Sequence, residues 1–324
     1  MVKTTLRTAG ACVLALGLVS PAGVAVAAEH SPGSTARAAV AQAKGKAGGD
    51  SSSAQCQVRT KKRTLVTSGA GAVQAAVNQA NAGDKLTITG TCHEHDITIG
   101  KNLTLNGDGT IDAAQQGRVI YNTADITITG GLTITGGDST NSTSNPGFGA
   151  GITNIGGSVT LREGSITGNN APFNGGGIYS DGGSVTINGG VISSNYGGIG
   201  GGGGIFSTGT ITLNGGAIAN NNASTGGGAM VYGTMTMNGG TVTGNTSLGA
   251  GGGIFNYNHV ILNGGTISGN SADLGGGIMA ISGTTALKGG AITANDGGGI
   301  YCDGGLTGDQ SIVYGNTPFD VQCF

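Results

Sequence analysis

The early part of the chain holds most of the side chains that could carry acid–base chemistry. Proton transfer and bond hydrolysis need a positioned acid and base, and paired carboxylates work at separations of about 5 to 9.5 Å. If an active site exists, we expect it here, beside an insertion from Asp138 to Phe148. The candidate residues are Lys101, Asp108, Asp112, Arg118, Asp125 and Asp138. The alternative, which we favour, is that they are turn residues and exposed pairs.

The run His93-Glu94-His95-Asp96 has residue types that bind metals. On a strand, alternate residues share a face, so the two imidazoles would lie side by side. A protein zinc site has at least three firm ligands, and no third one is visible nearby. We therefore expect a polar edge beside Cys92, with no metal and no other cofactor.

The later part of the chain is nearly free of charge. The charged residues between Gly175 and Ile300 are Asp181, Asp273, Lys288 and Asp296. Asp273 and Asp296 could hold a cation between them, but two solvated turn aspartates are the simpler explanation. The net charge of −2 indicates no particular partner, and we expect no nucleic acid to bind.

A repeat must position these side chains. Gly-Gly-Gly-Ile begins at Gly175, Gly202, Gly251, Gly275 and Gly297, with Gly-Gly-Gly-Ala at Gly226 and a degenerate copy at Gly149. From Gly175 onward the mean interval is about 24 residues. A fixed period of this size indicates stacked structural units.

Each unit is predicted to contain three short strands. The first follows the glycines, the second alternates as in Val185-Thr186-Ile187-Asn188, and the third carries an aliphatic residue such as Ile192 with an asparagine three residues later. Alternation places the aliphatic side chains inside, and coils about 4.8 Å apart would bury them in one core. The asparagine columns are expected to hydrogen-bond along the stack. Weaker copies upstream bring the total to at least eight coils.

Composition supports this arrangement and excludes others. Glycine makes up 70 of 324 residues, about three times its usual share, and each interior glycine costs a helix about 1 kcal/mol. Collagen is excluded because glycine does not recur every third residue. The sequence predicts an all-β parallel β-helix (a solenoid) over residues 56–324. A short helix from Ala72 to Asn81 is expected to cap its N-terminal end.

The ends of the chain indicate export. Residues 1–28 have the basic start, apolar stretch and small residues of a signal peptide. No other stretch is long and apolar enough to span a membrane, so we expect a secreted, extracellular protein without membrane insertion. Residues 29–55 are expected to form a flexible segment. The basic residues from 44 to 63 favour a solvated tail over a tether to anionic cell-surface polymers.

Four cysteines follow the predicted signal peptide. They are Cys56, Cys92, Cys302 and Cys323. An even number in an exported chain indicates disulfides, and we expect Cys56 to pair with Cys92 and Cys302 with Cys323, so that each bond pins one end. Zinc binding is the alternative, but neither pair has the spacing of two intervening residues.

Two columns of side chains are expected to face outward. The first is Tyr121, Tyr179, Phe206, Met230, Phe255, Met279 and Tyr301. Exposed aromatic rings on a rigid sheet could bind sugar rings or a protein, unless a neighbouring loop covers them. The second is Thr104, Thr127, Thr160, Thr186, Thr212 and Thr236. A flat threonine array resembles that of ice-binding β-solenoids, although threonine is also a common strand residue.

The segments AVQAAVNQANAGDKLTITGTC and ITIGKNLTLNGDG resemble the capping helix and first coils of the pectin-lyase-like superfamily of right-handed parallel β-helices. The repeats are similar to those of polymorphic outer-membrane proteins, with glycine in place of alanine and isoleucine or valine in place of phenylalanine. The resemblance covers roughly Cys56 to Phe324. It implies the fold but no single function, because the superfamily holds lyases, hydrolases, epimerases and adhesins.

We therefore expect a rigid binding or adhesion surface for a cell-surface polysaccharide or protein. The ligand-binding side chains would be Tyr121, Tyr179, Phe206, Phe255 and Tyr301. The alternative is a carbohydrate-active enzyme, either a polysaccharide lyase or a glycoside hydrolase, that uses Asp108, Asp112, Arg118, Asp125 and Asp138. An ice-binding solenoid is a more distant alternative.

Overall fold

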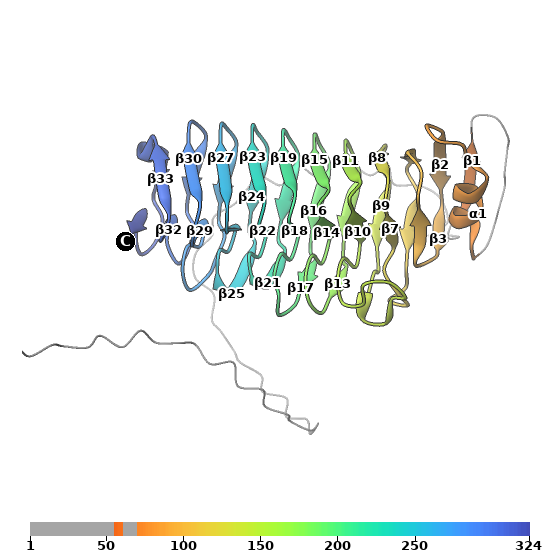
Figure 1. The fold of residues 1–324 in the computed structure, drawn as a ribbon, viewed down its shortest axis with the longest axis horizontal. Coiled ribbons are helices and arrows are strands. Elements are labelled where there is room, and N and C mark those ends of the chain that lie inside the picture. Colours follow the sequence, from red (N-terminus) through yellow and green to blue (C-terminus); the bar gives the residue numbers. More distant parts are fainter. Residues whose placement is uncertain (1–54, 61–69) are drawn as a thin grey trace, which may run out of the picture. The chain divides into compact units, whose positions relative to one another are not determined.

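The computed structural model describes residues 55–60 and 70–324. The predicted signal peptide lies outside the described residues, as does the segment predicted at 29–55 apart from Gln55. The described chain winds into a parallel β-helix whose coils stack along one axis (Figure 1). The predicted solenoid is confirmed.

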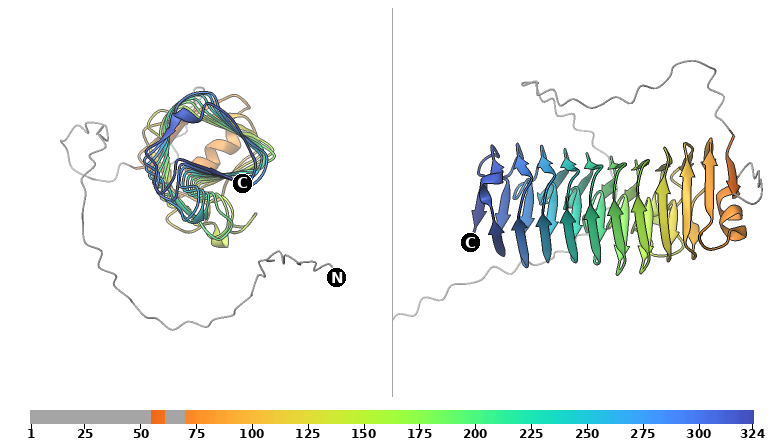
Figure 2. Two further views of the ribbon diagram at one scale, coloured as in Figure 1. Left: turned by 90° about the vertical axis from the view of Figure 1, so that its left-hand side faces the viewer. Right: turned by 90° about the horizontal axis from the view of Figure 1, so that it is seen from above.

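Three long sheets form the walls of the solenoid, as the view along its axis shows (Figure 2). Sheet 1 contains β1 (Gln57–Thr60), β2 (Lys85–Thr89), β5 (Leu103–Gly107), β8 (Asp125–Thr129), β11 (Ser158–Leu161), β15 (Ser184–Ile187), β19 (Thr210–Leu213), β23 (Thr234–Met237), β27 (His259–Leu262), β30 (Thr284–Leu287) and β33 (Gly305–Gly308). Sheet 2 contains β4 (Ile97–Ile99), β7 (Ile120–Asn122), β10 (Ile152–Ile155), β14 (Ile178–Asp181), β18 (Ile205–Ser207), β22 (Ala229–Val231), β26 (Ile254–Asn256), β29 (Ile278–Ala280), β32 (Ile300–Cys302) and β35 (Val321–Cys323). Sheet 3 contains β3 (Thr91–His93), β6 (Thr110–Asp112), β9 (Thr133–Thr135), β12 (Ser165–Thr167), β16 (Val191–Ser193), β20 (Ala217–Ala219), β24 (Thr241–Thr243), β28 (Thr266–Ser268), β31 (Ala291–Thr293) and β34 (Val313–Tyr314).

A fourth, shorter sheet adds a lobe to the middle coils and was not predicted. It contains β13 (Asn170–Ala171), β17 (Tyr196–Gly197), β21 (Asn222–Thr225) and β25 (Thr246–Ala250). These strands lie between the third predicted strand of each unit and the next glycine triplet. Strand β1 pairs with β2 in the antiparallel direction. With ten strands stacked in sheet 3, the coils extend over about 43 Å.

One continuous core fills the solenoid. Aliphatic side chains from the three long sheets are buried there, among them Ile178, Val185 and Ile192 of a single coil. Helix α1 (Ala72–Gln79) packs Val73 and Val77 onto the N-terminal end of this core. The predicted capping helix is therefore confirmed, and it ends two residues earlier than expected.

The glycine triplets are needed because coils stack backbone on backbone. Gly202 has a φ of +69°, a left-handed conformation that L side chains resist. Gly203 has an ordinary φ, but a Cβ there would lie 2.4 Å from the carbonyl oxygen of Asn222 in the next coil. The first glycine of a triplet thus serves the turn, and the second leaves room for the neighbouring chain.

The asparagine two residues after each sheet 3 strand, from β12 onward, forms a buried ladder along the stack, as predicted. Each side-chain amide donates to the side-chain oxygen of the next coil at 2.8–3.0 Å. The ladder consists of Asn169, Asn195, Asn221, Asn245, Asn270, Asn295 and Asn316. Asn316 finally donates to the carboxylate of Asp320 at 3.0 Å. Hydrogen bonds between buried side chains therefore link the turn of each coil to the turn of the next.

Both predicted disulfides are present, Cys56 with Cys92 and Cys302 with Cys323. The first lies in the first coil and the second in the last, so each cross-links one end of the stack. Within residues 55–60 and 70–324, no helix has the length and apolar character needed to cross a membrane.

Candidate functional site

The outer face of sheet 2 carries the predicted aromatic column. The residue before each of these is an isoleucine or, before Met230, Ala229, and it points into the core. Alternation therefore turns the column outward. The in-register positions are Tyr179, Phe206, Met230, Phe255, Met279 and Tyr301. They pack into an apolar cluster of their own, separate from the core.

Ring contacts continue through this cluster without a break from Phe148 to Phe255. Phe148 lies 5.1 Å from Tyr179, and Tyr179 stacks on Phe206 at 5.2 Å between ring centroids. Tyr232 then lies 5.4 Å from Phe206. It stacks on Tyr257 at 4.1 Å, and Tyr257 lies 4.9 Å from Phe255. The rings form one series along the axis of the solenoid.

Phe206 and Phe255, which we expected at the surface, are covered. Their exposed fractions are 7% and 6%, whereas Tyr232 is 41% exposed. The contacts above explain the difference, because Tyr232 and Tyr257 lie against the two phenylalanine rings. The phenylalanines form the floor of the aromatic series, and the tyrosines provide its accessible surface.

Our reading of the sequence missed Tyr232 and Tyr257. Tyr232 stands two residues after Met230, and Tyr257 two residues after Phe255. Side chains two residues apart on an extended chain point to the same side. The same alternation that identified the first column could therefore have identified these two tyrosines.

Tyr121 does not join the aromatic series. The register of sheet 2 places Thr153 between Tyr121 and Tyr179, and Thr153 is completely buried. The neighbour of Tyr121 is instead Arg118, whose guanidinium carbon lies 5.5 Å from the ring centroid.

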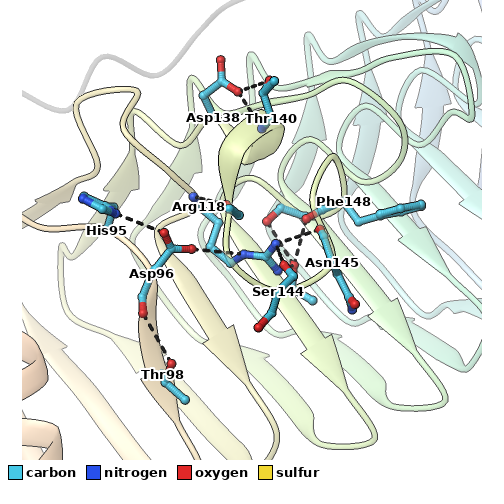
Figure 3. Close-up of polar contacts among 12 residues, drawn as sticks. His95, Asp96, Thr98, Arg118, Asp138, Thr140, Ser144, Asn145 and Phe148 are labelled. Carbon is cyan, nitrogen blue, oxygen red and sulfur yellow. Dashed lines mark hydrogen bonds and ion pairs between the residues drawn. The ribbon is translucent and has the colours of Figure 1, made fainter.

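Arg118 is the one candidate catalytic residue with an unusual environment. Its side chain is fully buried and lies between Asp96 and the insertion (Figure 3). Nη1 donates to the hydroxyl of Thr153, and Nη2 donates to the carbonyl oxygens of Ser144 and Asn145. Nε lies 3.6 Å from Oδ1 of Asp96. Burial lowers the pKa of Arg118, and the Asp96 carboxylate opposes that shift. The guanidinium therefore anchors the insertion.

The candidate carboxylates lie on different sides of the solenoid. Asp112 is in sheet 3, where it accepts a hydrogen bond from the Ala114 backbone at 2.8 Å. Asp125 is in sheet 1 and accepts one from the Ser158 hydroxyl at 2.7 Å. Asp138 accepts from the Thr140 backbone and caps the short 3₁₀ helix Ser139–Asn141.

The two remaining candidates also lie apart. Asp108 is exposed in the turn between β5 and β6. Lys101 donates to the carbonyl oxygen of Ala80 at 2.9 Å, at the C-terminal end of helix α1. The structure therefore does not bring the candidate catalytic residues together.

The residues of the His93-Glu94-His95-Asp96 run make separate structural contacts. Glu94 accepts hydrogen bonds from the backbone nitrogens of Val73 and Gln74, both at 2.8 Å, and thereby caps helix α1. Nδ1 of His93 lies 3.5 Å from Asp112, and Nδ1 of His95 lies 3.1 Å from Asp96. Across the described parts of the chain, no three histidine, cysteine or acidic side chains are grouped to hold a metal ion.

The geometry thus leaves the aromatic series on sheet 2 as the candidate functional surface. Comparison of the chain with protein-family models, with curated proteins and with solved structures found no match.

Proposed function

We propose that the outer face of sheet 2 binds an extended cell-surface polysaccharide. The observation that carries this proposal is the unbroken aromatic series, in which the exposed Tyr232 stacks on the half-buried Tyr257. Aromatic faces pack against the apolar faces of sugar rings, while the phenol hydroxyl stays available for hydrogen bonding. A series that runs along the solenoid would contact several successive sugars.

The rigidity of this surface supports binding. The column that carries the series is fixed by the parallel ladder of sheet 2, and its phenylalanines are already packed beneath the tyrosines. Side chains ordered before binding lose little conformational entropy when a ligand arrives. The surface is therefore preorganised.

Charge narrows the class of polysaccharide. The pKa of Tyr179 is raised, mainly because the side chain is partly buried and also because the carboxylate of Asp181 lies nearby. Lys288 is the only lysine or arginine between Gly175 and Ile300, and it directly follows β30 in sheet 1, away from this face. An acidic polysaccharide would meet carboxylates without compensating cations, so neutral or amino sugars fit better.

A matched set of tyrosine variants tests the proposal. Tyr232→Ser combined with Tyr257→Ser should weaken binding to a neutral insoluble polysaccharide such as cellulose or chitin by about tenfold or more. Tyr314→Ser is the control, because Tyr314 is 53% exposed but lies in sheet 3. Equal binding by the double variant and the control would disprove the proposal. Phe206 is a poorer test, because its loss would disturb packing.

The hydroxyl face of sheet 1 favours the ice-binding alternative as a second candidate. Two outward columns of hydroxyls lie in register there, for example Ser184 beside Thr210 and Thr186 beside Thr212. A flat array at strand spacing could order surface water. Thr212→Tyr should then abolish an effect on ice-crystal growth, whereas an unmodified growth rate with the wild-type protein would exclude this function.

A further inference from the structure

Tyr232 and Tyr257 belong to a further outward column on sheet 2, which we call the tyrosine column. It lies two residues after the predicted aromatic column, and residues two apart on an extended chain point to the same side. Backbone hydrogen bonds continue the parallel register to this position in successive coils. The members of the tyrosine column, in order along the stack, are Asp181, Thr208, Tyr232, Tyr257, Ile281 and Asp303.

A carboxylate lies on each side of the two tyrosines. Asp181 is two coils before Tyr232 and Asp303 is two coils after Tyr257, so each backbone separation is about 9.6 Å. Asp181 accepts a hydrogen bond from the Thr208 hydroxyl at 2.8 Å. Among the described residues, no hydrogen bond or ion pair engages the Asp303 carboxylate. Both aspartates are exposed, so both can meet a ligand that lies on the tyrosines.

Asp303 also lines a pocket on this same outer face of sheet 2. The pocket has a volume of about 340 Å³, at the small end of the range for ligand sites. Its lining residues are Leu274, Met279, Ile281, Tyr301, Asp303 and Phe324. Asp303 supplies the only charge among them. Apolar and aromatic walls suit the face of a sugar ring, and the carboxylate suits a positively charged substituent on that ring.

The charge of the surrounding coils favours a cationic ligand. Between Gly175 and Phe324, all of which the structure describes, Lys288 is the only lysine or arginine. The acidic residues of the same stretch are Asp181, Asp273, Asp296, Asp303, Asp309 and Asp320. The summed field of these coils therefore attracts cations and repels anions.

We propose that this surface selects a polysaccharide of amino sugars whose amino groups are free and protonated, such as a polymer of glucosamine. The preference rests on the proposed function, since the sugar rings must bind before charge can select among them. Rings stack on Tyr232 and Tyr257, and the ammonium groups of flanking sugars pair with Asp181 and Asp303. A polymer of N-acetylated sugars offers the same rings but no charge to pair with the carboxylates.

Matched hexasaccharides test this preference with the full chain, by isothermal titration calorimetry. At about pH 5.5, free amines are protonated and aspartates are ionised. The wild-type protein should bind a hexamer of glucosamine at least about tenfold more tightly than a hexamer of N-acetylglucosamine at about 20 mM salt, and the difference should shrink at about 300 mM salt. Hexalysine, which has a similar charge but no sugar rings, should bind more weakly than the glucosamine hexamer.

Threonine variants locate the preference in the two carboxylates. Asp181→Thr with Asp303→Thr should bring the affinities for the two sugar hexamers to within about twofold of each other. Binding of the N-acetylglucosamine hexamer should stay unchanged, because threonine already occupies this column at Thr208. Asp309→Thr is the control and should keep the full preference. Asp309 lies between β33 of sheet 1 and β34 of sheet 3, and threonine can still cap the short helix that follows it.

The outcomes distinguish this preference from the proposed function. Equal affinity of the wild-type protein for the two sugar hexamers, or a preference that persists in the double variant, overturns the selection of amino sugars and leaves the aromatic surface as a polysaccharide site. Hexalysine that binds as tightly as the glucosamine hexamer overturns the selection too, since charge alone would then be enough. Failure of both sugar hexamers to bind overturns the selection and the proposed function together.

Discussion

The side-chain oxygen of Asn245 accepts two hydrogen bonds from Asn221, one coil away. One comes from the side-chain nitrogen at 3.0 Å and one from the backbone nitrogen at 2.9 Å. Both residues are almost completely buried. The pair therefore couples the turn of one coil to the turn of the next, in a place that water does not reach.

Asn221→Ala should destabilise the protein by about 3–5 kcal/mol, because several buried groups lose hydrogen bonds. The Asn195 backbone nitrogen and the Ile192 carbonyl oxygen lose their bonds to Asn221, and the Asn195 side-chain nitrogen keeps only its bond to Ile166. Asn214→Ala is the control, since Asn214 lies in an exposed ladder with Asn188 and Asn238 and should cost less than about 0.5 kcal/mol. Chemical denaturation measures the free energy of unfolding of both variants. Equal losses of stability in the two variants would contradict a special role for burial.

Ala294→Gly should stabilise the protein by about 0.5 kcal/mol. Ala294 has a φ of +54°, a conformation that costs an L residue about 1–2 kcal/mol, and glycine removes that strain at a smaller entropic cost. Ala291→Gly in strand β31 is the opposite case and should destabilise by about 0.5–1 kcal/mol. Thermal melts give the melting temperatures of the two variants. If both temperatures shift in the same direction from that of the wild-type protein, backbone strain is not the cause.

Arg118→Met should destabilise the protein by about 3 kcal/mol, because it leaves Asp96 without its buried cation. It also removes the donors that hold the Ser144 and Asn145 carbonyl oxygens. The insertion should then be cut by protease near these residues, while the rest of the solenoid stays resistant. An insertion that remained protected in the variant would show that other contacts hold it.

Tyr232 provides a prediction at alkaline pH. Partial burial, together with the hydrogen bond that the Tyr232 hydroxyl donates to Tyr257, raises the pKa of Tyr232 to about 12, above its usual value near 10. The unfolded chain therefore loses this proton first, so stability that is present below pH 10 should decline between about pH 10 and pH 12. Melting temperatures of the wild-type protein and Tyr232→Phe should differ in their dependence on pH over this range. Parallel curves would contradict the shifted pKa.

The repeated parts of the fold were predictable because they are local. The period of about 24 residues and the alternation around Val185 and Ile192 depend only on neighbouring residues. In the structure these two side chains lie in the core and the ladder asparagines bond along the stack. Strand β17 was not predictable in this way, because two residues, Tyr196 and Gly197, show no alternation.

The site depends on contacts between distant segments, and the sequence predicted it less well. The charge of Arg118 suggested an exposed position, yet carbonyl groups 26 and 27 residues later replace water around it. The outward direction of Phe206 followed from alternation, but its burial depends on Tyr232 in the next coil. Periodicity predicts which way a side chain points, whereas coverage depends on which neighbour is large enough to reach it.

The backbone-to-backbone stacking at the glycine triplets makes the length of the molecule adjustable. Because Gly203 meets a carbonyl oxygen of the following coil and Gly227 meets one in the same way, adjacent coils present nearly interchangeable contact surfaces. A duplication or deletion of one whole repeat would restore the same contacts on both sides. A change in the number of repeats would therefore lengthen or shorten the solenoid in steps of about 4.8 Å, without a change at either end.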